Sequence, residues 1–264
     1  MSVPLPCLVP DHPLSPGVCV LSTLRQGGVS AAPFGAQPEA GGGLNLGLHC
    51  GDALQSVTAN RAILGQALPG PPRWLEQVHG SDVVVVEQSA DLSSDARSAP
   101  PRADAAVTRH RGEVLAVLTA DCLPVVLADR HARAIGIAHA GWRGLAAGVL
   151  ENTLAAMLRL SGGEAADCVA WLGPAIGPAH FEVGLDVHRA FCADDPGAAS
   201  AFRASSSPGK WWADLPALAR RRLRAAGVTQ IQGGRWCTFA DAHRFFSYRR
   251  DRVTGRMATL AWMS

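Results

Sequence analysis

Two short stretches of the chain hold residue types that bind metals or act as nucleophiles. Cys122 lies in residues 119–125 (TADCLPV), and His139 lies in residues 138–144 (AHAGWRG). Both adjoin short apolar runs of the kind that form buried strands, and His79 ends a further strand-like segment. Imidazole and thiolate ligands together suit zinc and also copper. The three side chains are therefore a candidate metal site, which the fold would have to assemble because they are far apart in the chain.

The three residues are separated by 43 and 17 positions, unlike the ligands of a zinc finger, which are closely spaced. Three protein ligands leave the fourth position of a tetrahedral ion for water or substrate, as in catalytic zinc sites. Zinc would bring the pKa of such a water close to neutrality and supply hydroxide. Ordinary core roles also fit these residues, because buried cysteines and hydrogen-bonded histidines are common.

The same residues permit a different chemistry, in which Cys122 is a nucleophile and His139 is its base. This requires contact between the two side chains, which antiparallel neighbouring strands would allow. Asp121 beside the cysteine could orient a histidine or carry a proton, and a turn residue at the end of a strand is the alternative. The residues alone leave ligand and nucleophile open.

Arg143 lies where the chain passes from the strand that holds His139 into a helix. The spacing of apolar residues predicts that helix over 145–160, and the sequence SGG at 161–163 would end it. Free backbone N–H groups at a helix start, together with a guanidinium, favour a small anion. A tight turn with a surface arginine is the alternative.

Strands and helices alternate along the chain, with hairpins between some of the strands. Apolar runs predict strands at 18–22, 83–86, 104–108, 114–118, 123–127, 134–138, 168–172, 228–232, 236–238 and 258–262, with a strand entered at 73–79. Further helices are predicted at 57–68, 185–192 and 215–226, and irregular segments at 31–43, 88–102 and 193–210. We expect one α/β domain of mixed α+β type over residues 1–264, with a mixed β-sheet core flanked by helices and an irregular N-terminal extension at 1–17.

Composition limits the classes of function. The 264 residues can bury a large core, and a net charge of +2 gives no general attraction to nucleic acids or membranes. The arginine-rich run at 220–224 is expected to be a solvated helix face. No apolar run approaches the length of a membrane span, and the N-terminus is unlike a signal peptide. The seven cysteines are odd in number and widely spaced, which favours reduced thiols and a cytoplasmic location.

Several motifs occur in a fixed order along the chain. The longer ones are QVHG at 77–80, TADCLP at 119–124, AHAGWRG at 138–144, GPAIG at 173–177 and FFSYRRD at 245–251. The shorter ones are RQGGVS at 25–30, NLG at 45–47, GD at 51–52 and CT at 237–238. From about Val18 to the C-terminus the chain thereby resembles the bacterial purine nucleoside phosphorylase or laccase-domain family, also called the peptidoglycan editing factor or multicopper polyphenol oxidase family.

The resemblance implies a single layered domain similar to the fold of toxin-type cysteine deamidases, and zinc bound by His79, Cys122 and His139. It also implies phosphorolysis of adenosine, inosine and methylthioadenosine to the free base and a ribose 1-phosphate, with deamination of adenosine as a second activity. Members of the family are also described as copper-dependent polyphenol oxidases and as editors of peptidoglycan precursors.

The sequence helps to choose among these activities. The copper cluster of a true laccase needs many histidine ligands, generally in His-x-His pairs, whereas this chain has nine histidines and no such pair. The chain also lacks the combined His-x-Glu and Pro-Cys-x-x-Cys signature of zinc nucleobase deaminases, which leaves deamination without an assigned proton carrier. We therefore expect a zinc-dependent purine nucleoside phosphorylase.

The further candidate residues fall into three groups: phosphate contacts, base or sugar contacts, and a proton carrier. They are Arg143, Arg25 and Arg249 for phosphate or the developing ribose oxyanion; Asn45, Trp142 and Phe246 for the base or sugar; and Asp121 for the proton. The rival hypotheses are a Cys–His hydrolase or amidase acting on peptidoglycan precursors, a copper-dependent polyphenol oxidoreductase, and a non-enzymatic metal-binding redox or scaffold protein. We expect small-molecule substrates, copper as the alternative metal, and a monomer or weak homo-oligomer.

Overall fold

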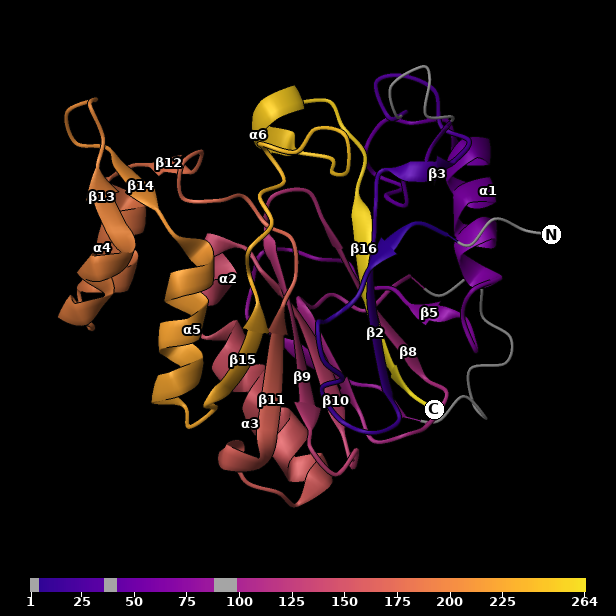
Figure 1. Ribbon diagram of the computed structural model, residues 1–264, viewed down its shortest axis with the longest axis horizontal. Coiled ribbons are helices and arrows are strands. Elements are labelled where there is room, and N and C mark those ends of the chain that lie inside the picture. Colours follow the sequence, from indigo (N-terminus) through magenta and orange to yellow (C-terminus); the bar gives the residue numbers. More distant parts are fainter. Residues whose placement is uncertain (1–4, 36–41, 88–98) are drawn as a thin grey trace.

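Two β-sheets lie face to face at the centre of the structure, a computed structural model that describes residues 5–35, 42–87 and 99–264 (Figure 1). The five-stranded sheet has the order β1 (Cys7–Leu8), β2 (Val18–Thr23), β16 (Met257–Met263), β8 (Val114–Thr119) and β5 (Pro72–Arg73). The six-stranded sheet has the order β15 (Gln230–Gly233), β11 (Cys168–Leu172), β9 (Leu123–Asp129), β10 (Ile135–Ala140), β7 (Ala105–Thr108) and β6 (Val83–Val85). Both sheets contain parallel and antiparallel pairs, so the predicted mixed-sheet core is confirmed.

Each sheet has helical cover on its outer face, which gives four layers (Figure 1). One buried cluster lies between the sheets and joins Val117 and Ala261 of the five-stranded sheet to Val126 and Ile137 of the six-stranded sheet. On the other face of the six-stranded sheet pack α3 (Val149–Ser161) and α5 (Leu215–Ala225). On the other face of the five-stranded sheet packs α1 (Leu54–Gly65).

The strands at the centre are buried on both faces. Every residue of β8, β9 and β10 is buried. Strands covered on both sides are expected to be continuous apolar runs, with little alternation of polar residues. This explains why the apolar runs next to Cys122 and His139 can be recognised in the sequence.

Smaller elements complete the domain. They are a three-stranded sheet of β12 (Glu182–Val183), β14 (Trp211–Ala213) and β13 (Phe202–Ala204), the pair β3 (Gln26–Gly28) and β4 (Gly42–Gly43), the helices α2 (Trp142–Ala146), α4 (Leu185–Cys192) and α6 (Tyr248–Asp251), and the 3₁₀ turns η3 (Ala165–Asp167) and η4 (Pro196–Ala201). In Figure 1 the three-stranded sheet and α4 extend to one side of the central sheets.

The helix predicted over 145–160 is wrong as a single element. The structure has α2 and then α3, because Gly148 takes a left-handed conformation (φ 91°) between them. Cys237, predicted within a strand, makes only an isolated bridge to Ala175. The segment predicted as a strand at 73–79 pairs only at β5, with a bridge between Glu76 and Arg102.

Other boundaries move by a few residues. The helix predicted at 57–68 begins three residues earlier, as α1, and the segments predicted as irregular contain β1, β4, η4 and β13. The predicted loops at 31–43 and 88–102 fall partly outside the described residues, at 36–41 and 88–98. Among the residues that the structure describes, no helix is both long enough and apolar enough to cross a membrane.

Candidate metal centre

The structure brings His79, Cys122 and His139 together. One ligand atom from each residue lies within 4.8 Å of the others. Sγ of Cys122 is 3.7 Å from Nε2 of His79, and the two imidazole rings are 4.8 Å apart at an angle of 77°. His79 is exposed, Cys122 is half-buried and His139 is buried, so the cluster opens to solvent on the side of His79. Two imidazoles and a thiolate at this spacing fit a zinc ion with one position left open.

Cys122 lies at the point where the chain passes from one sheet to the other. β8 ends in the five-stranded sheet at Thr119, and β9 begins in the six-stranded sheet at Leu123. Between them Asp121 adopts a φ of 96°, which non-glycine residues rarely take. The crossover therefore turns sharply immediately before the cysteine.

His139 is brought to the cysteine by a hairpin. β9 and β10 are antiparallel, with Leu123 opposite Ala140 and Pro124 opposite His139. The start of one strand therefore lies beside the end of the other, which is the antiparallel arrangement that allows Cys122 and His139 to meet. His79 reaches the same point from the turn after β5, where its φ is 61°.

Asp104 is the residue that the sequence analysis missed. It is fully buried, and its Oδ1 accepts hydrogen bonds from Nδ1 of His139 at 2.8 Å and from the backbone N–H of His79 at 2.9 Å. Its Oδ2 accepts from the N–H groups of Val78 at 3.1 Å and Gly80 at 2.6 Å. The signal in the sequence was an aspartate at the head of the apolar run 104–108, since a buried carboxylate needs partners.

The charges of the cluster shift its own titration. Burial raises the pKa of the Cys122 thiol, but the imidazoles of His139 and His79 outweigh burial and lower that pKa to about 6. Burial lowers the pKa of His139, but the Cys122 thiolate and the Asp104 carboxylate outweigh it and raise that pKa to about 9. Burial also opposes ionisation of Asp104, yet its hydrogen bonds from His139 and Gly80 hold its pKa below the usual value. The metal-free cluster is therefore a thiolate–imidazolium pair with a carboxylate behind it.

Two glycines in the sequence AHAGWRG make room for the cluster. A Cβ at Gly141 would lie 2.8 Å from Cδ2 of His79 and 3.1 Å from Sγ of Cys122. A Cβ at Gly144 would lie 2.5 Å from the carbonyl oxygen of Gly80. The start of α2 therefore packs directly against the side chains of His79 and Cys122 and against the turn that carries His79.

Asp121 braces the crossover. Its Oδ1 accepts from the Thr238 hydroxyl at 2.6 Å, its Oδ2 accepts from the backbone N–H of Arg249 at 2.6 Å, and its carbonyl accepts from the N–H of Ile176 at 2.9 Å. Both carboxylate oxygens are thus engaged with neighbouring segments. The left-handed conformation of Asp121 is held by these bonds, which fixes the direction in which Cys122 leaves the turn.

The arginines proposed for phosphate differ in their surroundings. Arg143 is exposed on α2, a helix of five residues, and its guanidinium lies 4.5 Å from the centre of the Trp142 ring. Arg25 donates to the carbonyls of Ala242 and Gly35 and lies over Phe246 at 4.9 Å, and burial lowers its pKa.

Two further candidates make hydrogen bonds to neighbouring segments of the domain. Arg249 donates from one guanidinium nitrogen to the carbonyl of Glu182. Asn45 is fully buried: its Oδ1 accepts from the N–H groups of Gly47 and Arg256, and its Nδ2 donates to Asp52. These contacts tie segments of the domain together, and the predicted contacts with substrate remain predictions.

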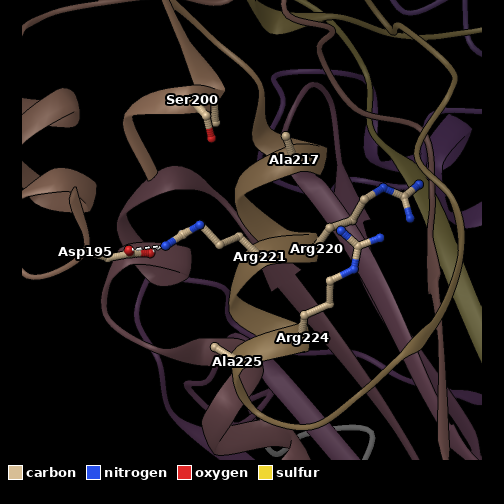
Figure 2. A pocket seen from close by; sticks show the side chains of 8 residues that line it. Asp195, Ser200, Ala217, Arg220, Arg221, Arg224 and Ala225 are labelled. Atoms are coloured by element: carbon tan, nitrogen blue, oxygen red, sulfur yellow. Dashed lines mark hydrogen bonds and ion pairs between the residues drawn. The ribbon is translucent and has the colours of Figure 1, made fainter. Parts of the chain in front are cut away.

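A surface cavity of about 670 Å³ lies along α5, and its lining contains none of the metal-site residues. Arg221 turns toward Asp195, on the opposite side of the helix from Arg220 and Arg224 (Figure 2). Arg221 and Arg224 are exposed, as expected for a solvated face, whereas Arg220 is half-buried and donates to backbone carbonyls, including that of Ile231.

Similarity to known proteins extends over nearly the whole chain. A family model described as "Multi-copper polyphenol oxidoreductase laccase" matches residues 19–264. A Xylella fastidiosa protein named "Purine nucleoside phosphorylase" is 53% identical over 266 residues, covering 97% of this chain and 96% of its own. The Escherichia coli protein "Purine nucleoside phosphorylase YfiH" is 46% identical over 258 residues, covering 97% and 98%.

Solved structures are similar over the same extent. Protein NMB0706 of Neisseria meningitidis matches with a TM-score of 0.85 and 45% identity, covering 98% of this chain and 99% of its own. YlmD of Geobacillus stearothermophilus matches with a TM-score of 0.88 and 33% identity, covering 100% and 98%.

Proposed function

The chain belongs to the family described as multi-copper polyphenol oxidoreductase laccase, and on that basis we propose that it is a zinc-dependent purine nucleoside phosphorylase. The observation that carries the proposal is the cluster of His79, Cys122 and His139, whose ligand atoms lie within 4.8 Å of one another. The names of relatives that match over nearly their full length support the reaction class. The proposed substrates are adenosine, inosine and methylthioadenosine, with deamination of adenosine as an additional activity.

The donor set favours zinc over the copper cluster of a laccase. One thiolate and two imidazoles are common ligands of catalytic zinc. Among the described residues this is the one group of three or more potential ligands at metal-binding distance, whereas a laccase needs several copper ions with their own histidines. Zinc in this position would act as a Lewis acid toward an oxygen of the substrate.

The residues of the chain would divide the remaining work. In phosphorolysis an oxygen of phosphate forms a bond to C1′ of the ribose, the C–N bond breaks, and its electron pair leaves with the base, which takes up a proton. Arg143 is exposed and follows His139 by four positions in the chain, so we assign it the phosphate contact. Arg25 and Arg249 are proposed as further contacts to phosphate or the developing ribose oxyanion, and Asn45 as a contact to the base or sugar, although each also makes a hydrogen bond inside the domain.

Turnover with and without phosphate tests the proposal. Zinc-loaded protein is expected to release adenine from adenosine only when phosphate is present, and His79→Ala is expected to abolish the release. Cys122→Ser is expected to lose the stoichiometric zinc. Fully metallated wild-type protein that releases no adenine from adenosine would sink the phosphorylase proposal.

A Cys–His hydrolase or amidase acting on a cell-wall precursor is the second candidate. The arrangement Asp104–His139–Cys122 in the metal-free protein, with the Cys122 pKa at about 6, favours it. Alkylation of Cys122 separates the two candidates: a zinc ligand is protected when zinc is bound and reacts when zinc is removed, whereas a nucleophile reacts in the active protein.

The phosphorylase proposal includes a small-molecule substrate, a monomer or weak homo-oligomer, and a cytoplasmic location, where the seven free cysteines would stay reduced.

A further inference from the structure

We propose that Asp104 is a positioning residue that orients both histidines of the metal centre through a single carboxylate. The inference rests on metal binding by His79, Cys122 and His139, as the proposed function requires. Asp104 stands outside the ligand set, so its contribution would be to the geometry of the ligands and to the metal affinity that follows from it.

The first route runs through the imidazole of His139. Its Nδ1 donates to Oδ1 of Asp104 at 2.8 Å, and its backbone N–H donates to the carbonyl of Asp104 at 2.7 Å. His139 is thereby held both at its ring and at its backbone by one residue. A proton fixed on Nδ1 leaves Nε2 as the nitrogen with a free lone pair, and metal-binding histidines are typically oriented by a carboxylate in this way.

The second route runs through the backbone of the turn that carries His79. Three successive N–H groups, those of Val78, His79 and Gly80, donate to the two oxygens of Asp104. His79 itself has a φ of 61°, a conformation that non-glycine residues take only when their surroundings impose it. The carboxylate supplies that constraint, and it thereby sets where the exposed imidazole of His79 points.

Together the two routes use both oxygens of the carboxylate as acceptors. Oδ1 serves His139 and the N–H of His79, and Oδ2 serves Val78 and Gly80. An amide has one acceptor oxygen and one NH₂ donor, so asparagine would direct a donor at one of these pairs of N–H groups. If the NH₂ faces His139, it favours the tautomer whose Nε2 carries the proton and cannot bind metal. If it faces Val78 and Gly80, the turn of His79 loses two of its three hydrogen bonds to residue 104.

Asp104→Asn therefore tests the inference, with Asp129→Asn as a matched control. Asp129 is also fully buried, and its carboxylate accepts from the N–H of His131 and from the guanidinium of Arg133. It ends β9, whereas Cys122 precedes that strand, so the two lie about 20 Å apart. The control removes a buried, hydrogen-bonded carboxylate without touching the ligands.

The zinc dissociation constant of each full-length variant is measured by competition with a chromophoric chelator, and the visible spectrum is recorded with cobalt(II) in place of zinc. We expect Asp104→Asn to weaken zinc binding by about 10- to 100-fold and to alter the cobalt spectrum. Asp129→Asn should leave both unchanged. Equal zinc affinities and identical cobalt spectra in the two folded variants would overturn the inference.

A measurement on the wild-type protein keeps the test independent of how well the variants fold. Long-range ¹H–¹⁵N NMR of the zinc-loaded protein should show His139 with a proton on Nδ1 and the metal on Nε2. Zinc on Nδ1 of His139 would contradict the inference. A protein that binds zinc in this way but performs no phosphorolysis would refute the proposed function and leave the role of Asp104 intact, and a protein that binds no zinc would refute both.

Discussion

Replacement of Gly141 by alanine would test how tightly the metal centre is packed. The added methyl carbon would lie 2.8 Å from Cδ2 of His79, whereas ordinary carbon–carbon contacts begin at about 3.5 Å. The ring would therefore have to move by about 0.7 Å, beyond the tolerance of about 0.2 Å in zinc–ligand distances. The backbone at Gly141 has φ −63° and ψ 157°, which alanine adopts freely, so the domain should still fold.

We expect Gly141→Ala to weaken zinc binding at least as much as loss of a residue that orients a ligand, by about 10- to 100-fold. The cost in folding stability should be about 1–3 kcal/mol, as for an overpacked site. Zinc affinity is measured by chelator competition, and stability by urea unfolding of the metal-free protein. Gly65→Ala is the control, because a Cβ at this last residue of α1 meets no heavy atom within 4 Å. Zinc affinity in Gly141→Ala equal to that of the control would refute the packing argument.

Two further predictions concern protons and the crossover. The pKa of Cys122 is about 6 and that of His139 about 9, so zinc binding between these pH values should release about one proton, from His139. The zinc affinity should therefore fall about tenfold for each unit by which the pH is lowered from 9 towards 6. Calorimetry in buffers of different ionisation enthalpy measures the release; binding without proton release would contradict these pKa values. Thr238→Val removes the hydroxyl that donates to Asp121, and should lower the free energy of unfolding by about 1–3 kcal/mol in urea titrations. Thr229→Val, at an exposed position, is its control, and equal stability of the two variants would show that the bond does not brace the crossover.

The sequence was informative where burial dictates residue type. β8, β9 and β10 are covered on both faces, so their apolar runs could be recognised, and so could the reactive residues at their ends. Contact between Cys122 and His139 was only a condition of the nucleophile hypothesis, and the structure meets it because a hairpin joins their strands. The division of the predicted helix at Gly148 was not foreseen, because a glycine inside a helical pattern does not reveal whether its φ is positive.

Partners that meet only in the folded chain could not be predicted. Asp104 binds the backbone of residues 78–80, and a backbone N–H group carries no signature in the sequence. The residue types of Arg25 and Asn45 suit contacts with a nucleoside or phosphate, but type does not indicate whether a polar group faces a ligand or the interior. In the structure their hydrogen bonds join distant segments of the domain.

X-ray absorption at the zinc edge of the zinc-loaded protein tests the central claim most directly. Coordination by His79, Cys122 and His139 predicts one sulfur at about 2.3 Å and two imidazole nitrogens at about 2.0–2.1 Å, with one further light atom in the open position. The sulfur should disappear in Cys122→Ser. A zinc shell of nitrogen and oxygen alone in the wild-type protein would contradict the account.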